Sequence, residues 1–122
     1  MPFSILIIDD YADNRELLRI MLEANGYRVL EAEDGLTGLR MAREETPALI
    51  LVDLSMPGLD GWGVLRELRN DERTRNIPCA SVSASPDGDG VQSSSQRFDA
   101  YLSKPFRRDK LIETVERLLK GR

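Results

Sequence analysis

Two short, uninterrupted apolar runs constrain the fold of this chain more than any other feature. Residues 5–8 are Ile-Leu-Ile-Ile and residues 48–52 are Ala-Leu-Ile-Leu-Val, and an aspartate follows each run. Runs of four or five residues are too short for a buried helix and are typical of strands buried on both faces. Such strands occur in parallel sheets that carry helices on both sides. The sequence therefore predicts a parallel sheet that contains these two segments.

Segments with helical spacing alternate with the strand-like segments. Asp34 precedes one of them as a helix cap, and Gly26 follows another as a terminator. The predicted strands cover residues 5–8, 27–32, 48–52, 77–83 and 100–103, and the predicted helices cover residues 12–25, 35–45, 62–70 and 107–120. This alternation predicts one α/β domain over residues 1–122, with a doubly wound parallel sheet and helices on both faces.

The crossover at residues 85–96 departs from this pattern. It contains Gly88, Gly90 and three consecutive serines, which are poor helix formers, and Val91 is its one large apolar residue. Burial of one valine contributes about 2 kcal/mol, which is less than the cost of ordering the segment. We expect a fourth helix that is short or disordered. The alternative is a short helix held in place by Val91 and Phe98.

Composition excludes several classes of function. The 122 residues include no histidine, which rules out Ser-His-Asp and Cys-His catalysis and histidine zinc sites. The net charge of −4 gives no general attraction to nucleic acid or to an anionic membrane. Cys79 is the single cysteine, and we interpret it as a small core residue and not a reactive thiol. Because no apolar run has the length of a membrane helix and no export signal is present, we expect a cytoplasmic protein.

Polar residues follow the predicted strands at one edge of the sheet. Asp9 and Asp10 follow the first strand, Asp53 the third, and Lys104 the fifth, while Ser83 ends the fourth. Ligands bind at this carboxyl edge in open α/β sheets. Three carboxylates so close together need a cation, and oxygen ligands suit Mg²⁺. With a lysine and a hydroxyl beside them, they form a site that can stabilise a phosphoryl group on an aspartate.

Four segments together resemble the receiver domain of two-component response regulators. They are Ile-Leu-Ile-Ile-Asp-Asp at residues 5–10, Val-Asp-Leu-Ser-Met-Pro-Gly-Leu-Asp-Gly at 52–61, Ser-Val-Ser-Ala at 81–84 and Asp-Ala-Tyr-Leu-Ser-Lys-Pro-Phe at 99–106. Each segment alone is a weak signal, but in this order they are specific, and the resemblance covers the whole chain. It implies the flavodoxin-like receiver fold, with five parallel strands in the order 2-1-3-4-5.

The resemblance also implies an acceptor and a metal site. Asp53 is expected to accept the phosphoryl group from a phosphohistidine of a partner histidine kinase or phosphotransfer protein. Mg²⁺ is expected to bind Asp10 directly, Asp9 through water, Asp53, and the backbone carbonyl of Ser55. Taken without the resemblance, Asp9 and Asp10 could simply cap the helix that follows, and the segment after Asp53 could be only a turn.

A switch is implied by three further residues. Lys104 is expected to pair with the phosphoryl oxygens, and Ser83 to close its hydroxyl onto the phosphoryl group. Tyr101 matches the aromatic residue that turns inward as Ser83 moves, so phosphorylation is expected to change partner binding. Individually these residues have plainer interpretations: a surface lysine, a polar strand end and a half-buried strand residue.

The first helix is the candidate surface for docking of the kinase, because it begins beside the acidic pair. Its inner face is predicted to comprise Leu18, Met21, Leu22 and Asn25, which leaves Ile20 off that face and Leu17 at its edge. The candidate docking residues are Asp13, Asn14, Leu17, Ile20, Pro105 and Phe106. Single exposed apolar residues are also common on surfaces that bind nothing.

Three other functions compete with a phosphorylated receiver. A metal-dependent aspartyl-phosphate phosphohydrolase of the haloacid-dehalogenase type needs a second carboxylate two residues after its nucleophile, where this chain has Ser55. A flavodoxin-like electron carrier needs a phosphate-binding loop where this chain has Asp9 and Asp10. A receiver-like module that acts without phosphorylation would not need the intact acidic residues. The pathway and the downstream protein target do not follow from the sequence.

Overall fold

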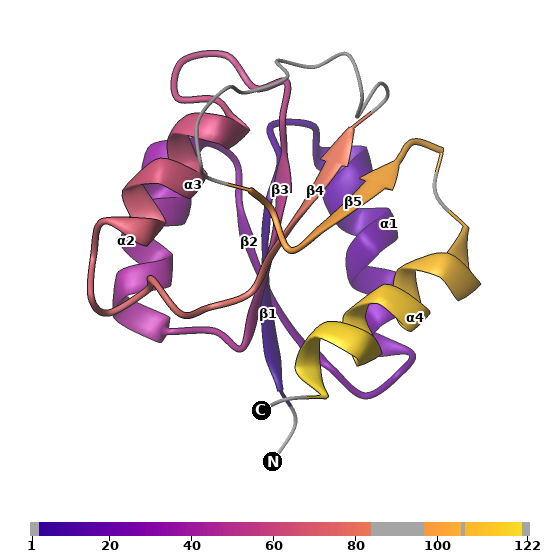
Figure 1. The fold of residues 1–122 in the computed structure, drawn as a ribbon. Coiled ribbons are helices and arrows are strands. Elements are labelled where there is room, and N and C mark those ends of the chain that lie inside the picture. The colour runs from indigo at the N-terminus through magenta and orange to yellow at the C-terminus, as the bar shows by residue number, and fades with distance from the viewer. Residues whose placement is uncertain (1–2, 84–96, 106, 121–122) are drawn as a thin grey trace.

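The computed structural model describes residues 3–83, 97–105 and 107–120. Within these residues, five parallel strands form one sheet in the order β2-β1-β3-β4-β5, with helices on both faces (Figure 1). The elements are β1 (Ser4–Ile8), α1 (Ala12–Glu23), β2 (Arg28–Ala32), α2 (Gly35–Glu45), β3 (Leu49–Asp53), α3 (Gly61–Arg69), β4 (Cys79–Ser83), β5 (Ala100–Ser103) and α4 (Arg108–Leu119). The predicted fold class and strand order are confirmed. The prediction of a short or disordered helix in residues 85–96 falls outside the described residues.

The helices form two layers, with α2 and α3 on one face of the sheet and α1 and α4 on the other (Figure 1). β1 and β3 supply both cores, because successive side chains of a strand point to opposite faces. The core beneath α2 and α3 includes Leu6, Ile8, Ile50 and Val52, and the core beneath α1 and α4 includes Ile5, Ile7, Leu49 and Leu51. Each of these side chains is at most 1% exposed, which confirms two strands buried on both faces.

α1 buries one side and exposes apolar residues on the other. Leu18 and Leu22 are buried against the sheet. Leu17 and Ile20 are 45% and 54% exposed, as the helical spacing predicts. The helix therefore presents an apolar outer surface to solvent that the core does not use.

The end of α1 differs from the prediction. Asn25 does not lie on the inner face, because the helix ends two residues earlier and the chain turns at Gly26, whose φ is 89°. Asn25 is exposed, and its side-chain amide donates to the carbonyl of Met21 (2.9 Å). At the start of β4 the boundary also shifts, because Pro78 has no N–H and the strand begins at the next residue.

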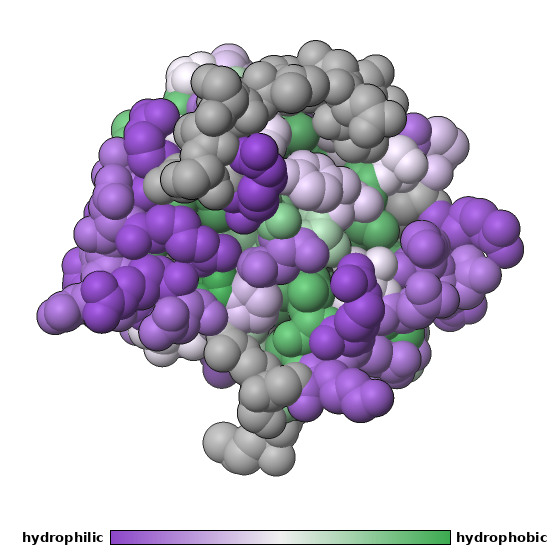
Figure 2. Space-filling model, viewed as in Figure 1, coloured by the Kyte–Doolittle hydropathy of each residue, from purple (hydrophilic) through white to green (hydrophobic). Residues whose placement is uncertain are grey.

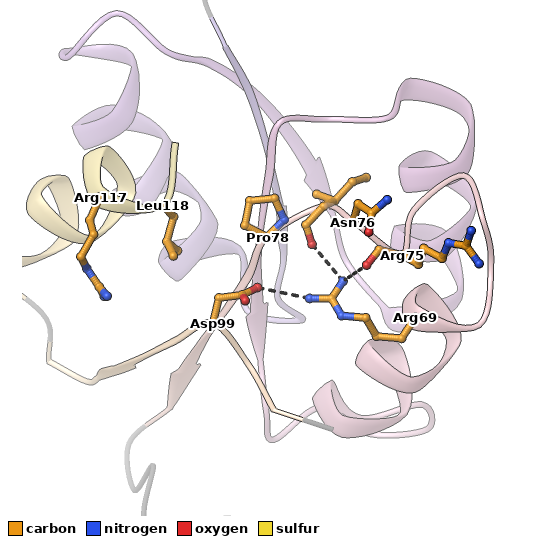
Figure 3. Close-up of a pocket in the computed structure, with 8 residues that line it drawn as sticks. Arg69, Arg75, Asn76, Pro78, Asp99, Arg117 and Leu118 are labelled. Carbon is orange, nitrogen blue, oxygen red and sulfur yellow. Dashed lines mark hydrogen bonds and ion pairs between the residues drawn. The ribbon is translucent and has the colours of Figure 1, made fainter. Parts of the chain in front are cut away.

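Arg69 fastens α3 to the amino ends of β4 and β5 (Figure 3). Its guanidinium donates to the carbonyl oxygens of Arg75 (3.1 Å) and Ile77 (2.9 Å) and pairs with Asp99 Oδ2 (3.2 Å). The same Asp99 oxygen accepts from the backbone N–H of Cys79 (2.8 Å). Arg69, Asp99 and the segment from Arg75 to Pro78 line a shallow hollow of about 600 Å³ together with two residues of α4. The hollow lies at the edge where β4 and β5 begin, away from the carboxyl ends of the strands.

Cys79 is fully buried in the core beneath α2 and α3. Burial raises the pKa of its thiol to about 12, although the nearby guanidinium of Arg69 acts in the opposite direction. A thiol with this pKa carries almost no thiolate at neutral pH. The interpretation of Cys79 as a core residue and not a reactive thiol is confirmed.

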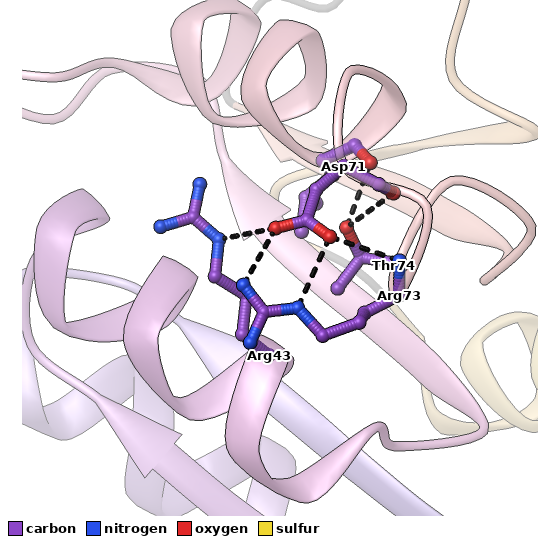
Figure 4. A network of polar contacts seen from close by, with 5 residues as sticks. Arg43, Asp71, Arg73 and Thr74 are labelled. Carbon is purple, nitrogen blue, oxygen red and sulfur yellow. Dashed lines mark hydrogen bonds and ion pairs between the residues drawn. The ribbon is translucent and has the colours of Figure 1, made fainter.

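The connection from α3 to β4 is tied down by Asp71 (Figure 4). Its Oδ2 pairs with Arg43 Nε of α2 (2.9 Å) and Arg73 Nη2 (3.0 Å), and its Oδ1 accepts from the Arg73 backbone N–H (2.9 Å). The buried hydroxyl of Thr74 donates to the carbonyl of Leu68 (2.7 Å). The bonds from Arg73 are the main reason that the pKa of Asp71 falls to about 2.

Apolar side chains reach the surface between the charged helices. Figure 2 shows hydrophilic residues over α2, α3 and α4 and apolar residues between them. None of the helices in the described ranges is both long and apolar enough to span a bilayer.

The Asp71 network predicts a specific pH dependence of stability. The pKa of Asp71 is about 2 in the folded chain against an ordinary value of 3.8, so ionised Asp71 stabilises the fold. That contribution is complete well above pH 3.8 and is lost as the pH falls toward 2. We expect Asp71→Asn to lower the free energy of unfolding by a constant amount above about pH 5. The difference from wild type should shrink below about pH 4. Urea denaturation across pH 3–7 measures both, and a difference independent of pH would contradict the assignment.

Candidate functional site

Three carboxylates and a lysine meet at the carboxyl edge of the sheet. Asp53 is the last residue of β3, Asp9 and Asp10 follow β1, and Lys104 follows β5. One carboxylate oxygen from each aspartate lies within 4.8 Å of the other two. The Nζ atom of Lys104 lies 3.8 Å from Asp9 Oδ2 and 3.7 Å from Asp53 Oδ1. The structure thus brings together four of the residues that the sequence placed at this edge.

Asp9 is the most deeply buried of the three acids. It is 1% exposed, and its Oδ1 accepts from the backbone N–H of Tyr11 (2.9 Å). Its Oδ2 is buried without a hydrogen-bond partner in the part of the chain that the structure describes. Burial raises the pKa of Asp9, and the charges of Asp53 and Asp10 raise it further, against the opposing effects of the Tyr11 N–H and Lys104. The Asp9 carboxylate therefore lacks sufficient neutralising partners from the protein.

The arrangement fits a small divalent cation. Asp53 is 6% exposed and Asp10 is exposed, so the cluster has one side toward solvent. Three carboxylates face a single ammonium group, which leaves an excess of negative charge in a partly buried site. A hard cation with oxygen ligands would neutralise that charge and give Asp9 Oδ2 a partner, and Mg²⁺ commonly uses one or two carboxylates with waters in its remaining positions.

The loop after Asp53 is held close to the acid. Asp53 Oδ1 accepts from the backbone N–H of Ser55 (3.1 Å), and Ser55 itself is exposed. The carbonyl of Leu54 accepts from Gly61 N (3.4 Å), at the first residue of α3. The Asp60 side chain caps α3 by accepting a hydrogen bond from the backbone N–H of Gly63 (2.9 Å). The loop between β3 and α3 is therefore anchored at both ends beside the acid.

Ser83 and Tyr101 lie in adjacent strands but in different surroundings. Ser83 is fully buried at the end of β4, and its carbonyl accepts from Lys104 N (2.8 Å). Tyr101 is 42% exposed on β5, and its hydroxyl accepts from the backbone N–H of Phe98 (3.2 Å). In this structure the Tyr101 ring thus lies at the surface, and the inward position expected of a switch stays a prediction.

Trp62 completes an aromatic cluster that the sequence did not reveal. Its ring centroid lies 5.1 Å from that of Phe98 and 6.4 Å from that of Tyr101. Trp62 belongs to α3 and Tyr101 to β5, so no periodicity within one segment could have paired them. The cluster joins the helix that follows the Asp53 loop to the edge strand of the sheet.

The candidate docking residues lie where the sequence placed them, as far as the structure describes them. Asp13 is exposed and Asn14 half-buried in the first turn of α1, and Leu17 and Ile20 are exposed on the same helix. Pro105 is exposed next to Lys104. Phe106 lies outside the described residues.

The chain resembles known proteins along nearly its whole length. The response regulator receiver domain model matches residues 5–116. The polar-differentiation response regulator DivK of Brucella anthropi is 37% identical over 120 residues, which is 98% of either chain.

Solved structures agree with this assignment. The receiver domain of a sensor histidine kinase from Pseudomonas aeruginosa, which holds a magnesium ion in its active site cleft, is 31% identical. Its TM-score is 0.90, and the match covers 98% of this chain and 99% of that chain. A chemotaxis protein CheY4 of Vibrio cholerae, at 23% identity and a TM-score of 0.84 over 98% of this chain and all of that one, shares the fold.

The family match also decides between the competing functions. It includes residues of all five strands and the four residues of the acidic site, and it excludes both the phosphohydrolase and the electron carrier. Receiver domains are phosphorylated by histidine kinases. The chain therefore belongs to the response regulator receiver family and is a phosphorylation-activated signalling protein, not an enzyme.

Proposed function

We propose that Asp53 accepts the phosphoryl group from a phosphohistidine of a histidine kinase or phosphotransfer protein. The observation that carries this assignment is the position of Lys104, whose Nζ lies 3.7 Å from Asp53 Oδ1. In the transfer, an Asp53 oxygen bonds to phosphorus as the bond from phosphorus to the histidine nitrogen breaks. Lys104 balances charge on the phosphoryl oxygens, and the Ser83 hydroxyl donates to one of them.

Asp9, Asp10, Asp53 and the backbone carbonyl of Ser55 hold Mg²⁺ in this proposal. Support comes from the mutual approach of the three carboxylates and from Asp9 Oδ2, which is buried without a hydrogen-bond partner among the described residues. Bound Mg²⁺ supplies positive charge to a phosphoryl group that arrives at Asp53. The protein's own task is to keep these oxygens close together before the donor docks.

A switch from Ser83 to Tyr101 would connect the site to partner binding. Ser83 and Lys104 are joined through the backbone, and Ser81 of β4 pairs with Tyr101 of β5 in the sheet. When the Ser83 hydroxyl moves toward a phosphoryl group, the adjacent strand β5 shifts with it, because the two strands are hydrogen-bonded. Tyr101 then leaves the surface position in which it contacts Trp62.

We place the phosphoryl transfer in the cytoplasm, where an unpaired thiol such as Cys79 stays reduced.

The donor approaches over α1, which starts beside Asp10 and exposes Leu17 and Ile20. Apolar residues at the centre of an interface contribute most of its binding energy. The exposed residues of α1 are therefore the docking surface in this proposal.

The acceptor assignment is tested by mass spectrometry. Incubation with acetyl phosphate and Mg²⁺ should add about 80 Da, one phosphoryl group, to a single carboxylate. Asp53→Asn should abolish the added mass, because the amide is a poor nucleophile. Asp34→Asn is a matched control, since Asp34 caps α2 and asparagine caps equally well. Added mass that persists in Asp53→Asn would disprove the assignment.

Alanine substitutions at two glycines of α3 should affect the rate of phosphorylation differently, because one of these glycines contacts the backbone of the Asp53 loop. A Cβ at Gly61 would lie 2.7 Å from the carbonyl oxygen of Asp53 and 2.8 Å from Leu54 Cα, so Gly61→Ala must displace the loop backbone. A Cβ at Gly63 would meet the flexible end of the Leu59 side chain at 2.5 Å and would lie in ordinary contact with Asp60 Oδ1 at 3.4 Å, without touching the loop backbone. A misplacement near 1 Å can slow a reaction about 100-fold. We expect Gly61→Ala to slow phosphorylation by acetyl phosphate at least about tenfold and Gly63→Ala to leave it within about twofold. Equal rates in the two variants would contradict a loop that positions Asp53.

Docking over α1 predicts a selective defect. Ile20→Asp should slow transfer from a phosphorylated histidine kinase about tenfold, because it places a charge in an apolar contact. Phosphorylation by acetyl phosphate should be unchanged. Leu36→Asp is the control: Leu36 is 73% exposed on α2, a helix of the opposite layer. Equal slowing with both donors in Ile20→Asp would indicate damage to the site and not loss of docking.

A further inference from the structure

Arg15 of α1 connects the acidic loop to the neighbouring strand. Its Nη1 donates to the backbone carbonyl oxygen of Asp9 (2.7 Å), and its Nε donates to Glu31 Oε1 on β2 (3.2 Å). The Arg15 side chain is only 16% exposed, so water competes little for these contacts. The role of Asp9 as a metal ligand, on which this inference rests, is the proposed function above.

The carbonyl that Arg15 binds belongs to the peptide between Asp9 and Asp10. A peptide is planar, so a hydrogen bond to its oxygen sets the orientation of the whole unit. The orientation of that unit determines where both acidic side chains begin. On the other side of Asp9, its backbone N–H donates to the carbonyl of Ala32 (3.1 Å). The two peptide units on either side of Asp9 are therefore each held by one hydrogen bond.

Glu31 holds the arginine in place. Glu31 stands opposite Ile7 in the pairing of β1 with β2. Ile7 is the second-to-last residue of β1, so Glu31 lies close to the start of the acidic loop. Its Oε1 accepts from Arg15, and its Oε2 pairs with Arg19 Nε (3.1 Å). Because a guanidinium presents its donors in a rigid plane, fixing Nε at Glu31 directs Nη1 toward the Asp9 carbonyl.

Arg19 provides a natural comparison within the same helix. It carries the same charge and pairs with the same glutamate. Within the described residues its other ion pairs are with Glu16 (3.9 Å) and Glu23 (3.4 Å), neither of which belongs to the acidic loop. Removal of a positive charge near the carboxylates should tighten cation binding by Coulomb attraction alone. Loss of a residue that orients a ligand weakens metal binding, typically about 10- to 100-fold. The two roles predict opposite signs.

We propose that Arg15 is a positioning residue for the Mg²⁺ site. It orients the peptide between Asp9 and Asp10 so that both carboxylates face Asp53, and Glu31 keeps its guanidinium aligned. Its positive charge opposes cation binding, but the geometric effect is larger.

The test compares Mg²⁺ binding by the full chain and three variants, measured by calorimetric titration with Mg²⁺ alone. Arg15→Met should weaken binding about tenfold. Arg19→Met should leave it unchanged or slightly tighter. Arg15→Lys should give an intermediate affinity, because an ammonium reaches only one of the two partners. Urea denaturation without metal verifies that each variant is folded. If Arg15→Met is not folded, Glu31→Gln replaces it, because loss of the Glu31 contact should weaken binding in the same direction.

These measurements distinguish failure of the positioning role of Arg15 from failure of the Mg²⁺ site itself. Equal effects of Arg15→Met and Arg19→Met, or tighter binding in Arg15→Met, would overturn the positioning role while the metal site stands. Absence of Mg²⁺ binding in the wild-type chain would overturn the metal site and the positioning role together. A selective loss in Arg15→Met with partial recovery in Arg15→Lys is the result that we expect.

Discussion

The burial of two carboxylates beside each other is the constraint on which the rest of the structure depends. Asp9 and Asp53 are 1% and 6% exposed, and Lys104 lies within 4 Å of both. Like charges in a poorly solvated site repel strongly, and burial raises the pKa of Asp9. The fold keeps them together because Asp53 ends β3 and Asp9 follows β1, and these neighbouring strands are packed on both faces. The repulsion leaves a site prepared for positive charge.

Packing on both faces of β1 and β3 keeps Asp9 and Asp53 in place despite the repulsion between their carboxylates. β1 and β3 are packed from both sides, by α2 and α3 on one face and by α1 and α4 on the other. Interiors packed in this way transmit displacement and do not absorb it. The buried acids Asp9 and Asp53 therefore lie at the ends of two strands that are packed on both faces, whereas Tyr101 lies on the edge strand β5.

Local contacts refine what the sheet positions. The loop after Asp53 is held against Gly61, and the peptide after Asp9 is held by Arg15. Neither contact involves a titrating group of the site itself. Both act on the backbone from which the acids project, so a substitution there should change affinity and rate without changing the chemistry.

Much of the fold and most of the site were determined by the sequence itself. The apolar runs before Asp9 and Asp53 could only be buried strands, and their alternation with helical segments required parallel strands whose carboxyl ends share one edge. Side-chain pairs between distant segments were decided by the tertiary structure alone. Arg15 and Arg19 have the same charge and both pair with Glu31, a contact between α1 and β2 that no pattern within either segment indicates. Of the two, Arg15 also donates to the Asp9 carbonyl. Likewise, the sequence does not indicate that the ring of Trp62 on α3 lies 6.4 Å from that of Tyr101 on β5. Sequence patterns report the face that an element buries, but a contact between two elements depends on how they pack, which no single segment encodes.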